Sequence, residues 1–393
     1  MARALILAWL YLLLHGFWRG LRDPVWAVHA AASAWGLARQ GRLSHFLLYD
    51  YLAKRYRCRT KLVLSQRSPS VYRKFPWLVT ESAPRLRHDL AQGQLAHPPR
   101  ILLIRRGAIG DVLMATPIVR KLFLDRDGFC QIHVATKHAQ VFANSPYVHE
   151  VIPFDELPRR SEPFDLVIDL DGVYERNPAA HVIDCYAFHA FGRVDFDKSI
   201  DLFESDLERA RMVQEIASIG GRYIVAHKPN HHWPSRNLPL NFWSDLLHRL
   251  LALSDVKIVQ IGGAGDLALS GDPRLLDHRN RYSLQELKLL VESSSSFLGV
   301  DAGPLHIAAA TKTPMVVFFT SAHHALRKPF RPVGSFHPIQ PAIECYGCQI
   351  SNPPPGTDYF CRRGDNQCVN SFDAGAVAMT VMSALSEPGL TSK

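Results

Sequence analysis

The chain has 393 residues, of which 47% are hydrophobic and 21% are charged. This balance is typical of globular proteins and argues against a wholly disordered, collagen-like or polytopic membrane protein. The net charge is +9, yet residues 1–100 carry 16 Lys and Arg against 4 Asp and Glu, a net of +12, which leaves −3 for residues 101–393. This uneven charge predicts a basic N-terminal segment joined to a larger globular part.

The first 62 residues combine an apolar run, several tryptophans and a basic run. Residues 4–17 are almost uninterruptedly apolar, but they are fewer than the ~20 residues that span a hydrocarbon core. The basic run follows at residues 54–61. Aromatic rings and cations of this kind are typical of helices that lie among lipid headgroups. We therefore expect residues 1–62 to be a helical segment that associates with an anionic membrane surface, and we expect no nucleic-acid partner.

Other interpretations of residues 1–62 remain open. The apolar run is also compatible with a membrane-spanning helix or with a signal peptide cleaved near the small residues 30–34. It is equally compatible with extra helices that pack on the globular body, because short apolar runs are often buried core.

Residues 63–99 lose periodicity and contain several prolines, which predicts a linker. From Arg100 onward, short apolar runs alternate with amphipathic stretches, the pattern of repeated βα units. The predicted strands are 101–104, 131–135, 165–170, 222–226, 256–261, 297–300 and 315–319. The predicted helices are 111–124, 178–190, 203–218, 241–253, 284–292 and 303–311. We expect two Rossmann-like α/β domains, 100–220 and 221–393, with a ligand-binding cleft at the carboxyl ends of their strands.

The turn after the first predicted strand carries the first candidate site. It reads RRGAIGD over residues 105–111 and leads directly into an amphipathic helix. Gly110 lets the backbone approach a ligand closely, and Asp111 stands at the helix start. The turn is neither a Walker A loop nor a complete G-x-G-x-x-G, so it does not support generic nucleotide binding. Asp111 is either a plain helix cap or a functional carboxylate.

A second turn follows the predicted strand 297–300 and reads DAGPLHIAAA over residues 301–310. Pro304 is tolerated in the first turn of a helix. Free N–H groups at Ala302, Gly303 and Leu305 would favour a pyrophosphate at this positive helix end. Asp301 either bonds a ribose hydroxyl or caps the helix, and His306 either contacts phosphate or fills core.

The segments RGAIGDVLMATP (residues 106–117) and DAGPLHIAAA (residues 301–310), in this order, resemble glycosyltransferase family 9, the heptosyltransferases of lipopolysaccharide core synthesis. Trp233-Pro234, after a predicted strand, is similar to a third segment of that family. The resemblance covers roughly residues 100–382 and leaves the basic N-terminal segment outside.

The resemblance implies a GT-B architecture, with the acceptor on the N-terminal domain and a nucleotide sugar, ADP-heptose above all, on the C-terminal domain. It also implies inverting transfer without a catalytic metal. Asp111 matches the proposed base of the family. Asp301, Ala302 and Gly303 match its nucleotide-diphosphate site, and Gly110 and His306 belong to the same motifs.

The chain departs from the family at two positions of the donor site. His231 stands where a lysine is usual, two residues before the Trp-Pro pair, and Ala302 replaces the commoner Ser or Thr. A fixed cation near the phosphates is therefore missing. Lys228, His232 and Arg236 are the candidate replacements, although a merely solvated polar loop is the alternative.

Four of the seven cysteines lie within 24 residues, with the spacing C-x2-C-x12-C-x6-C. They are Cys345, Cys348, Cys361 and Cys368. This pattern favours a tetrahedral thiolate site with a structural role, holding zinc or alternatively iron. Members similar to heptosyltransferase II carry a similar cysteine-containing tail. Disulfides are the alternative, but a cytosolic chain keeps its thiols reduced.

These observations predict a membrane-associated glycosyltransferase on the cytoplasmic side of the inner membrane. It would transfer a heptose or related sugar to a saccharide or glycolipid of the cell envelope. Two alternatives are a heptosyltransferase that modifies autotransporter proteins, and a non-catalytic scaffold that binds a nucleotide sugar at the membrane. The sequence leaves the oligomeric state open.

Overall fold

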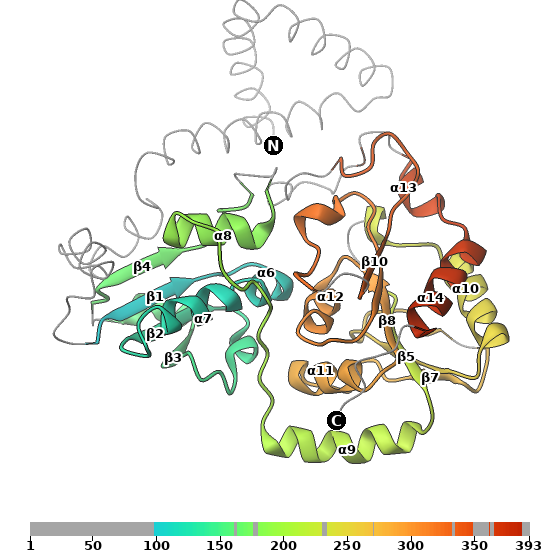
Figure 1. Ribbon diagram of the computed structural model, residues 1–393, viewed down its shortest axis with the longest axis horizontal. Coiled ribbons are helices and arrows are strands. Elements are labelled where there is room, and N and C mark those ends of the chain that lie inside the picture. The colour runs from blue at the N-terminus through green and yellow to red at the C-terminus, as the bar shows by residue number, and fades with distance from the viewer. Residues whose placement is uncertain are drawn as a thin grey trace, which may run out of the picture. The chain divides into compact units, whose positions relative to one another are not determined.

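The computed structural model describes residues 98–160, 163–175, 180–229, 234–269, 271–331, 335–348, 361 and 365–386. The predicted membrane segment 1–62 and nearly all of the linker 63–99 lie outside these residues. All described residues belong to one compact unit. Within it the chain forms two parallel β-sheets, each covered by helices (Figure 1). Among the described residues, no helix is long and apolar enough to cross a membrane.

The first sheet has four parallel strands in the order β3-β2-β1-β4. Their bounds are β1 Arg100–Ile104, β2 Gln131–Thr136, β3 Glu150–Pro153 and β4 Leu166–Asp169. Alternate side chains of these strands point to opposite faces and form two separate cores. One core includes helices α6 (Ile109–Leu113), α7 (Thr116–Leu124) and α8 (Val182–Phe191); the other includes the 3-10 helix η3 (Phe154–Arg159). We call described residues 98–202 the N-terminal lobe.

The second sheet has six parallel strands in the order β10-β9-β8-β5-β6-β7. Their bounds are β5 Tyr223–His227, β6 Lys257–Ile261, β7 Leu275–Asp277, β8 Ser296–Val300, β9 Met315–Phe318 and β10 Phe336–Ile339. We call described residues 203–386 the C-terminal lobe. Two cores again sandwich the sheet, as continuous burial on both faces of a parallel sheet requires.

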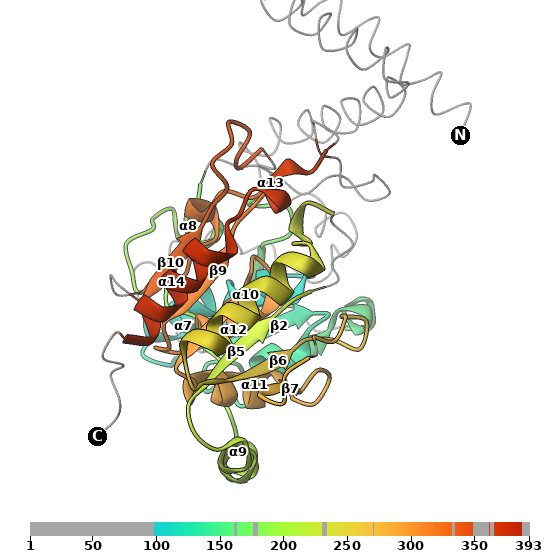
Figure 2. The same ribbon diagram turned by 90° about the vertical axis from the view of Figure 1, so that its right-hand side faces the viewer.

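Helices cover both faces of the second sheet. One face is covered by α10 (Leu240–Leu253) and α14 (Ala374–Ser386), which lie side by side in Figures 1 and 2. The other carries α9 (Asp206–Ile219), α11 (Leu284–Glu292) and α12 (Gly303–Ala308). The remaining elements are η2 (Ala139–Phe142), η4 (Pro234–Arg236), η5 (His324–Leu326) and α13 (Gln367–Asn370).

These elements confirm the predicted α/β class with parallel sheets. The predicted helix 111–124 is in fact two helices, because α6 ends at Leu113 and α7 begins at Thr116. Pro117 explains the break: it has no N–H and stands in the first turn of α7, where a proline is tolerated. The exact domain bounds stay a prediction, although β4 and β5 belong to different sheets.

Candidate active site

The turn after β1 places Asp111 as the third residue of α6, where the residue is buried with 7% exposure. Its Oδ2 accepts a hydrogen bond of 3.0 Å from the backbone N–H of Ala108. Asp111 therefore does cap its helix. The capping bond occupies only one of the two carboxylate oxygens, so the same residue can also have a chemical role.

A fully buried guanidinium lies against this carboxylate. Arg105 Nη2 is 3.3 Å from Asp111 Oδ2 and donates a 3.0 Å hydrogen bond to Glu175 Oε1. Its Nη1 donates to the carbonyl oxygen of Leu170, at the end of β4. Arg105 thus joins the end of β1 to the end of β4 and fixes one side of the Asp111 carboxylate.

Tyr174 fixes the other side. Its hydroxyl donates a 3.0 Å hydrogen bond to Asp111 Oδ1. Its ring faces Arg105, with 5.2 Å from the Cζ atom to the ring centroid. Burial, together with the nearby carboxylates of Asp111 and Glu175, raises the pKa of Tyr174. The phenol therefore keeps its proton and acts as a hydrogen-bond donor.

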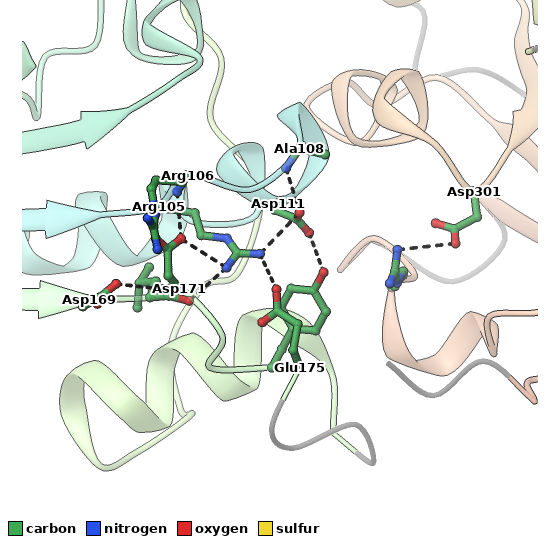
Figure 3. Close-up of polar contacts among 11 residues, drawn as sticks. Arg105, Arg106, Ala108, Asp111, Asp169, Asp171, Glu175 and Asp301 are labelled. Atoms are coloured by element: carbon green, nitrogen blue, oxygen red, sulfur yellow. Dashed lines mark hydrogen bonds and ion pairs between the residues drawn. The ribbon is translucent and has the colours of Figure 1, made fainter. Parts of the chain in front are cut away.

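Carboxylates outnumber cations around Asp111. Asp171 pairs with the side chain of Arg106 and accepts a 2.8 Å hydrogen bond from its backbone N–H. We call Arg105, Arg106, Asp111, Asp171, Tyr174 and Glu175 the Asp111 cluster (Figure 3). Three carboxylates against two guanidiniums give it a formal charge of −1. Burial also raises the pKa of Glu175.

The opposite charge surrounds Asp301, at the end of β8. Arg236 Nη2 lies 3.2 Å from Asp301 Oδ2, and its Nη1 donates a 3.0 Å hydrogen bond to the Asp301 carbonyl oxygen. Arg327 Nη1 lies 3.7 Å from the same Oδ2. We call Arg236, Asp301 and Arg327 the Asp301 cluster; two guanidiniums and one carboxylate give it a formal charge of +1. Figure 3 shows Asp301 on the C-terminal lobe, to the right of Asp111.

The lobes touch where α6 meets α12. A Cβ atom on Gly110 would come within 2.6 Å of His306 Cδ2, and one on Gly303 within 2.6 Å of Ile109 Cγ2. Both glycines are therefore needed for close packing of the two helices, whatever else they do. His306 is buried, which lowers its pKa to about 4 and leaves it neutral at pH 7.

The start of α12 differs from the expectation in one respect. Ala302 is the N-cap residue and Pro304 stands in the first turn, as predicted. The N–H of Leu305, however, donates a 3.0 Å hydrogen bond to the carbonyl oxygen of Ala302. That donor was expected to be free for a pyrophosphate, and the expectation was wrong because the first turn closes on itself.

Of the candidate replacements for the missing cation, Arg236 lies in the Asp301 cluster. Lys228 is buried just after β5; burial lowers its pKa, and the nearby Asp266 carboxylate opposes that effect. His231 and His232 lie outside the described residues. Sequence analysis missed Arg105, Tyr174 and Arg327. No motif marks Tyr174 or Arg327, whereas Arg105 directly precedes the recognised segment.

The four clustered cysteines all fall within the described residues, and none forms a disulfide. Burial raises the pKa of the Cys368 thiol to about 12, and the proximity of the other three thiols adds to the shift. Four thiols are a donor set that suits zinc or iron. However, the described residues contain no group of three or more His, Cys, Asp or Glu side chains that could hold a metal ion.

Comparison with known proteins agrees with this architecture. The model of glycosyltransferase family 9 (heptosyltransferase) matches residues 185–348. The match includes the Asp301 cluster and ends at Cys348, whereas Asp111 lies before it. It confirms the resemblance predicted from the sequence and indicates a glycosyltransferase. No curated protein sequence matches the chain.

Several solved structures share the fold. A family 9 glycosyltransferase from Veillonella parvula is 15% identical, with a TM-score of 0.59 over 74% of this chain and 98% of that chain. The iron-containing dodecameric glycosyltransferase TibC from enterotoxigenic E. coli is 18% identical, with a TM-score of 0.55 over 74% of this chain and 77% of that chain. E. coli ADP-heptose lipopolysaccharide heptosyltransferase II is 15% identical, with a TM-score of 0.52 over 72% of this chain and 99% of that chain. At these identities the likeness concerns the fold alone.

Proposed function

We propose that this protein is an inverting glycosyltransferase that transfers a heptose or related sugar from ADP-heptose to a saccharide or glycolipid of the cell envelope. The observation that carries the proposal is the opposite formal charge of two clusters, one on each lobe. The Asp111 cluster suits the uptake of a proton, and the Asp301 cluster suits a diphosphate.

The reaction follows from these charges. The oxygen of an acceptor hydroxyl attacks the anomeric carbon from the face opposite the diphosphate, while the Asp111 carboxylate takes the hydroxyl proton. The bond between the anomeric carbon and the diphosphate oxygen breaks, and its electron pair stays on the diphosphate. Arg236 and Arg327 would stabilise that developing negative charge, because buried guanidiniums act strongly in a site shielded from water. The step as proposed uses no metal.

The choice of donor draws on two structures of similar fold. One is the iron-containing heptosyltransferase TibC in complex with ADP-D-beta-D-heptose, 16% identical with a TM-score of 0.56. The other is the E. coli heptosyltransferase WaaC with ADP, 15% identical with a TM-score of 0.50. In this chain Arg236 and Arg327 would provide the cations that the usual lysine provides, alongside Lys228, Ala302 and Gly303.

The test uses the purified full-length protein with a panel of nucleotide sugars. We expect ADP-heptose to raise the melting temperature most, and to be hydrolysed or transferred to an extracted cell-envelope glycolipid by the wild type but not by D111N. A stabilising donor that the wild type never turns over would instead favour the non-catalytic scaffold. Stabilisation by a different nucleotide sugar would reassign the donor.

A protein hydroxyl is the second candidate acceptor, favoured by the four neighbouring cysteines. The similar-fold protein TibC is described as iron-containing, and an autotransporter-protein heptosyltransferase would likewise combine this fold with a thiolate metal site. Cys368 Sγ contacts the carbonyl oxygen of Ser235 at 4.0 Å, directly before Arg236. A bound ion would therefore have a structural role in holding the segment that carries this arginine.

Elemental analysis of the purified protein tests the metal proposal. We expect about one iron or zinc per chain, and loss of that metal with a lower melting temperature in C345S or C361S. C130S is the matched control, since Cys130 is buried in the N-terminal lobe away from the four cysteines. Two disulfides and no metal would overturn the proposal.

We place the protein on the cytoplasmic side of the inner membrane, on the basis of its N-terminal composition. Liposome flotation tests this location: the full chain should bind anionic vesicles in a salt-sensitive manner, and deletion of residues 1–62 should abolish or greatly weaken binding. If neither the full chain nor the deletion variant binds anionic vesicles, the proposed membrane location is wrong.

A further inference from the structure

We propose that Tyr174 is a positioning residue with two tasks: its hydroxyl orients the Asp111 carboxylate, and its ring holds Arg327 of the opposite lobe beside Asp301. The first task rests on the proposed function, in which Asp111 is the base. The second concerns donor binding and can be tested without turnover.

The Tyr174 hydroxyl contacts a different oxygen of the Asp111 carboxylate from the one that Ala108 and Arg105 contact. Ala108 N–H and Arg105 both contact Oδ2 of Asp111, whereas Tyr174 donates to Oδ1 at 3.0 Å. Together they fix the plane of the carboxylate. A carboxylate oxygen accepts more than one hydrogen bond, so Oδ1 keeps a lone pair for the acceptor hydroxyl. Without Tyr174, the carboxylate would keep only its Oδ2 contacts among these three.

The ring of Tyr174 contacts two guanidiniums, one from each lobe. The Cζ atom of Arg105 is 5.2 Å from the ring centroid, and that of Arg327 is 5.8 Å from it. Cation–π contacts at such distances are favourable and grow stronger when they are shielded from water. Tyr174 is only 4% exposed. Arg327 in turn lies 3.7 Å from Asp301 Oδ2, so one side chain of the N-terminal lobe contacts both clusters.

Tyr186 provides a matched control in the same core. It is fully buried, and its ring also faces Arg105, at 5.4 Å. Its hydroxyl has no hydrogen-bond partner among the described residues. Y174F and Y186F each delete one hydroxyl from a ring that faces Arg105, but only Y174F loses a hydrogen bond to Asp111.

The experiment compares full-length wild type, Y174F, Y174L and Y186F. For each we would measure kcat and KM with ADP-heptose, the Kd for ADP by calorimetry, and the melting temperature. Y174F keeps the ring, so kcat should fall roughly 10-fold to 100-fold while the ADP Kd stays unchanged. Y174L also loses the ring, so the ADP Kd should rise roughly 3-fold to 30-fold. Y186F should have the kcat and the ADP Kd of the wild type. If Y174L melts below the assay temperature, Y174M serves the same comparison.

Each outcome bears on a defined part of the proposal. An unchanged kcat in Y174F, with D111N inactive, would overturn the role of the hydroxyl and leave the proposed function intact. An ADP Kd in Y174L equal to that of Y174F would overturn the role of the ring. A kcat loss of equal size in Y186F would show that the effect is general to this core. A wild type that transfers no sugar would overturn the proposed function and the role of the hydroxyl together, while ADP binding would still decide the role of the ring.

Discussion

The two aspartates at the contact between the lobes differ in what surrounds them. Asp111 lies in a cluster with formal charge −1, whereas Asp301 lies in a cluster with formal charge +1. Both residues are buried, at 7% and 4% exposure. The same residue type is thus prepared for two tasks by its neighbours, and the identity of the side chain alone does not assign the role.

Each cluster is built mainly from its own lobe. Asp111 is held by the turn after β1, by Arg105 and by Tyr174, while Asp301 is held by Arg236 of η4 and by Arg327 after η5. At this site the lobes meet where His306 packs on Gly110, Ile109 packs on Gly303, and Tyr174 contacts Arg327. The role of each half of the site can therefore be tested with variants of its own.

The largest expected effect is that of D111N, which removes basicity from the negative cluster. Asparagine keeps an oxygen that can accept the bond from Ala108 N–H, so the cap survives. If Asp111 is the base, kcat should fall roughly 10²-fold to 10⁴-fold, the range typical of general acid–base groups. The ADP Kd and the melting temperature should hardly change. Steady-state kinetics, calorimetry and thermal melting check the three quantities.

A different result for D111N would change the comparison between the clusters. Loss of fold together with loss of ADP binding would make Asp111 a helix cap only, and the base would have to be sought among other carboxylates. D184N is a suitable control, because Asp184 lies in the same lobe on α8 and pairs with Lys198 away from the cluster. It should keep the turnover of the wild type.

The next effect in size concerns the positive cluster. R236Q removes one of the two cations beside Asp301 and brings the formal charge of that cluster to zero. We expect the ADP Kd to rise roughly 10-fold to 100-fold, which corresponds to about 1.4 to 2.8 kcal/mol. The melting temperature should also fall, because a buried carboxylate loses a close partner. Calorimetry with ADP and thermal melting measure both.

R249Q is the matched control for R236Q. Arg249 lies on the exposed face of α10 and pairs with Asp245 at 2.9 Å, a surface pair that contributes little. R249Q removes the same charge from the same lobe as R236Q does, but away from Asp301. Its ADP Kd should therefore equal that of the wild type. An unchanged ADP Kd in R236Q as well would mean that the diphosphate binds elsewhere.

Much of the fold follows from the sequence because its central strands are continuous apolar runs. The seven predicted strands and six predicted helices are all present. The sequence did not predict three of the strands, β3, β7 and β10, and all three lie at sheet edges. These three strands are only partly buried, and β3 and β10 contain Pro153 and Pro338, so they lack the apolar run that marks a buried strand. The helix α14 was also missed, although it is rich in alanine and apolar residues.

The candidate site was only partly predictable for a different reason. Asp111 and Asp301 stand at turns with glycines and a helix start, which are local signals. Tyr174 and Arg327 act through contacts with residues 63 and 26 positions away in the chain, and no local pattern encodes such contacts. Arg236 was named only as a nearby cation, and its pairing with Asp301 depends on the fold of the C-terminal lobe.

The smallest expected effect concerns His306, at the contact between the clusters, and it appears in the pH dependence of stability. Burial lowers the pKa of this histidine to about 4 from an ordinary value of 6.5, so between these values the unfolded chain binds a proton that the folded protein excludes. The contribution of neutral His306 to the free energy of unfolding is fully present above about pH 6.5. It is lost as the pH falls towards 4, by up to about 1.4 kcal/mol per pH unit.

H306Q cannot bind this proton, so its free energy of unfolding should fall less steeply than that of the wild type between pH 6 and 4.5. Urea unfolding of the wild type and H306Q over this range measures the slopes, and H248Q, at an exposed position on α10, should keep the slope of the wild type. A slope in H306Q equal to that of the wild type would mean that folded His306 binds its proton as readily as the unfolded chain does, and would contradict the lowered pKa.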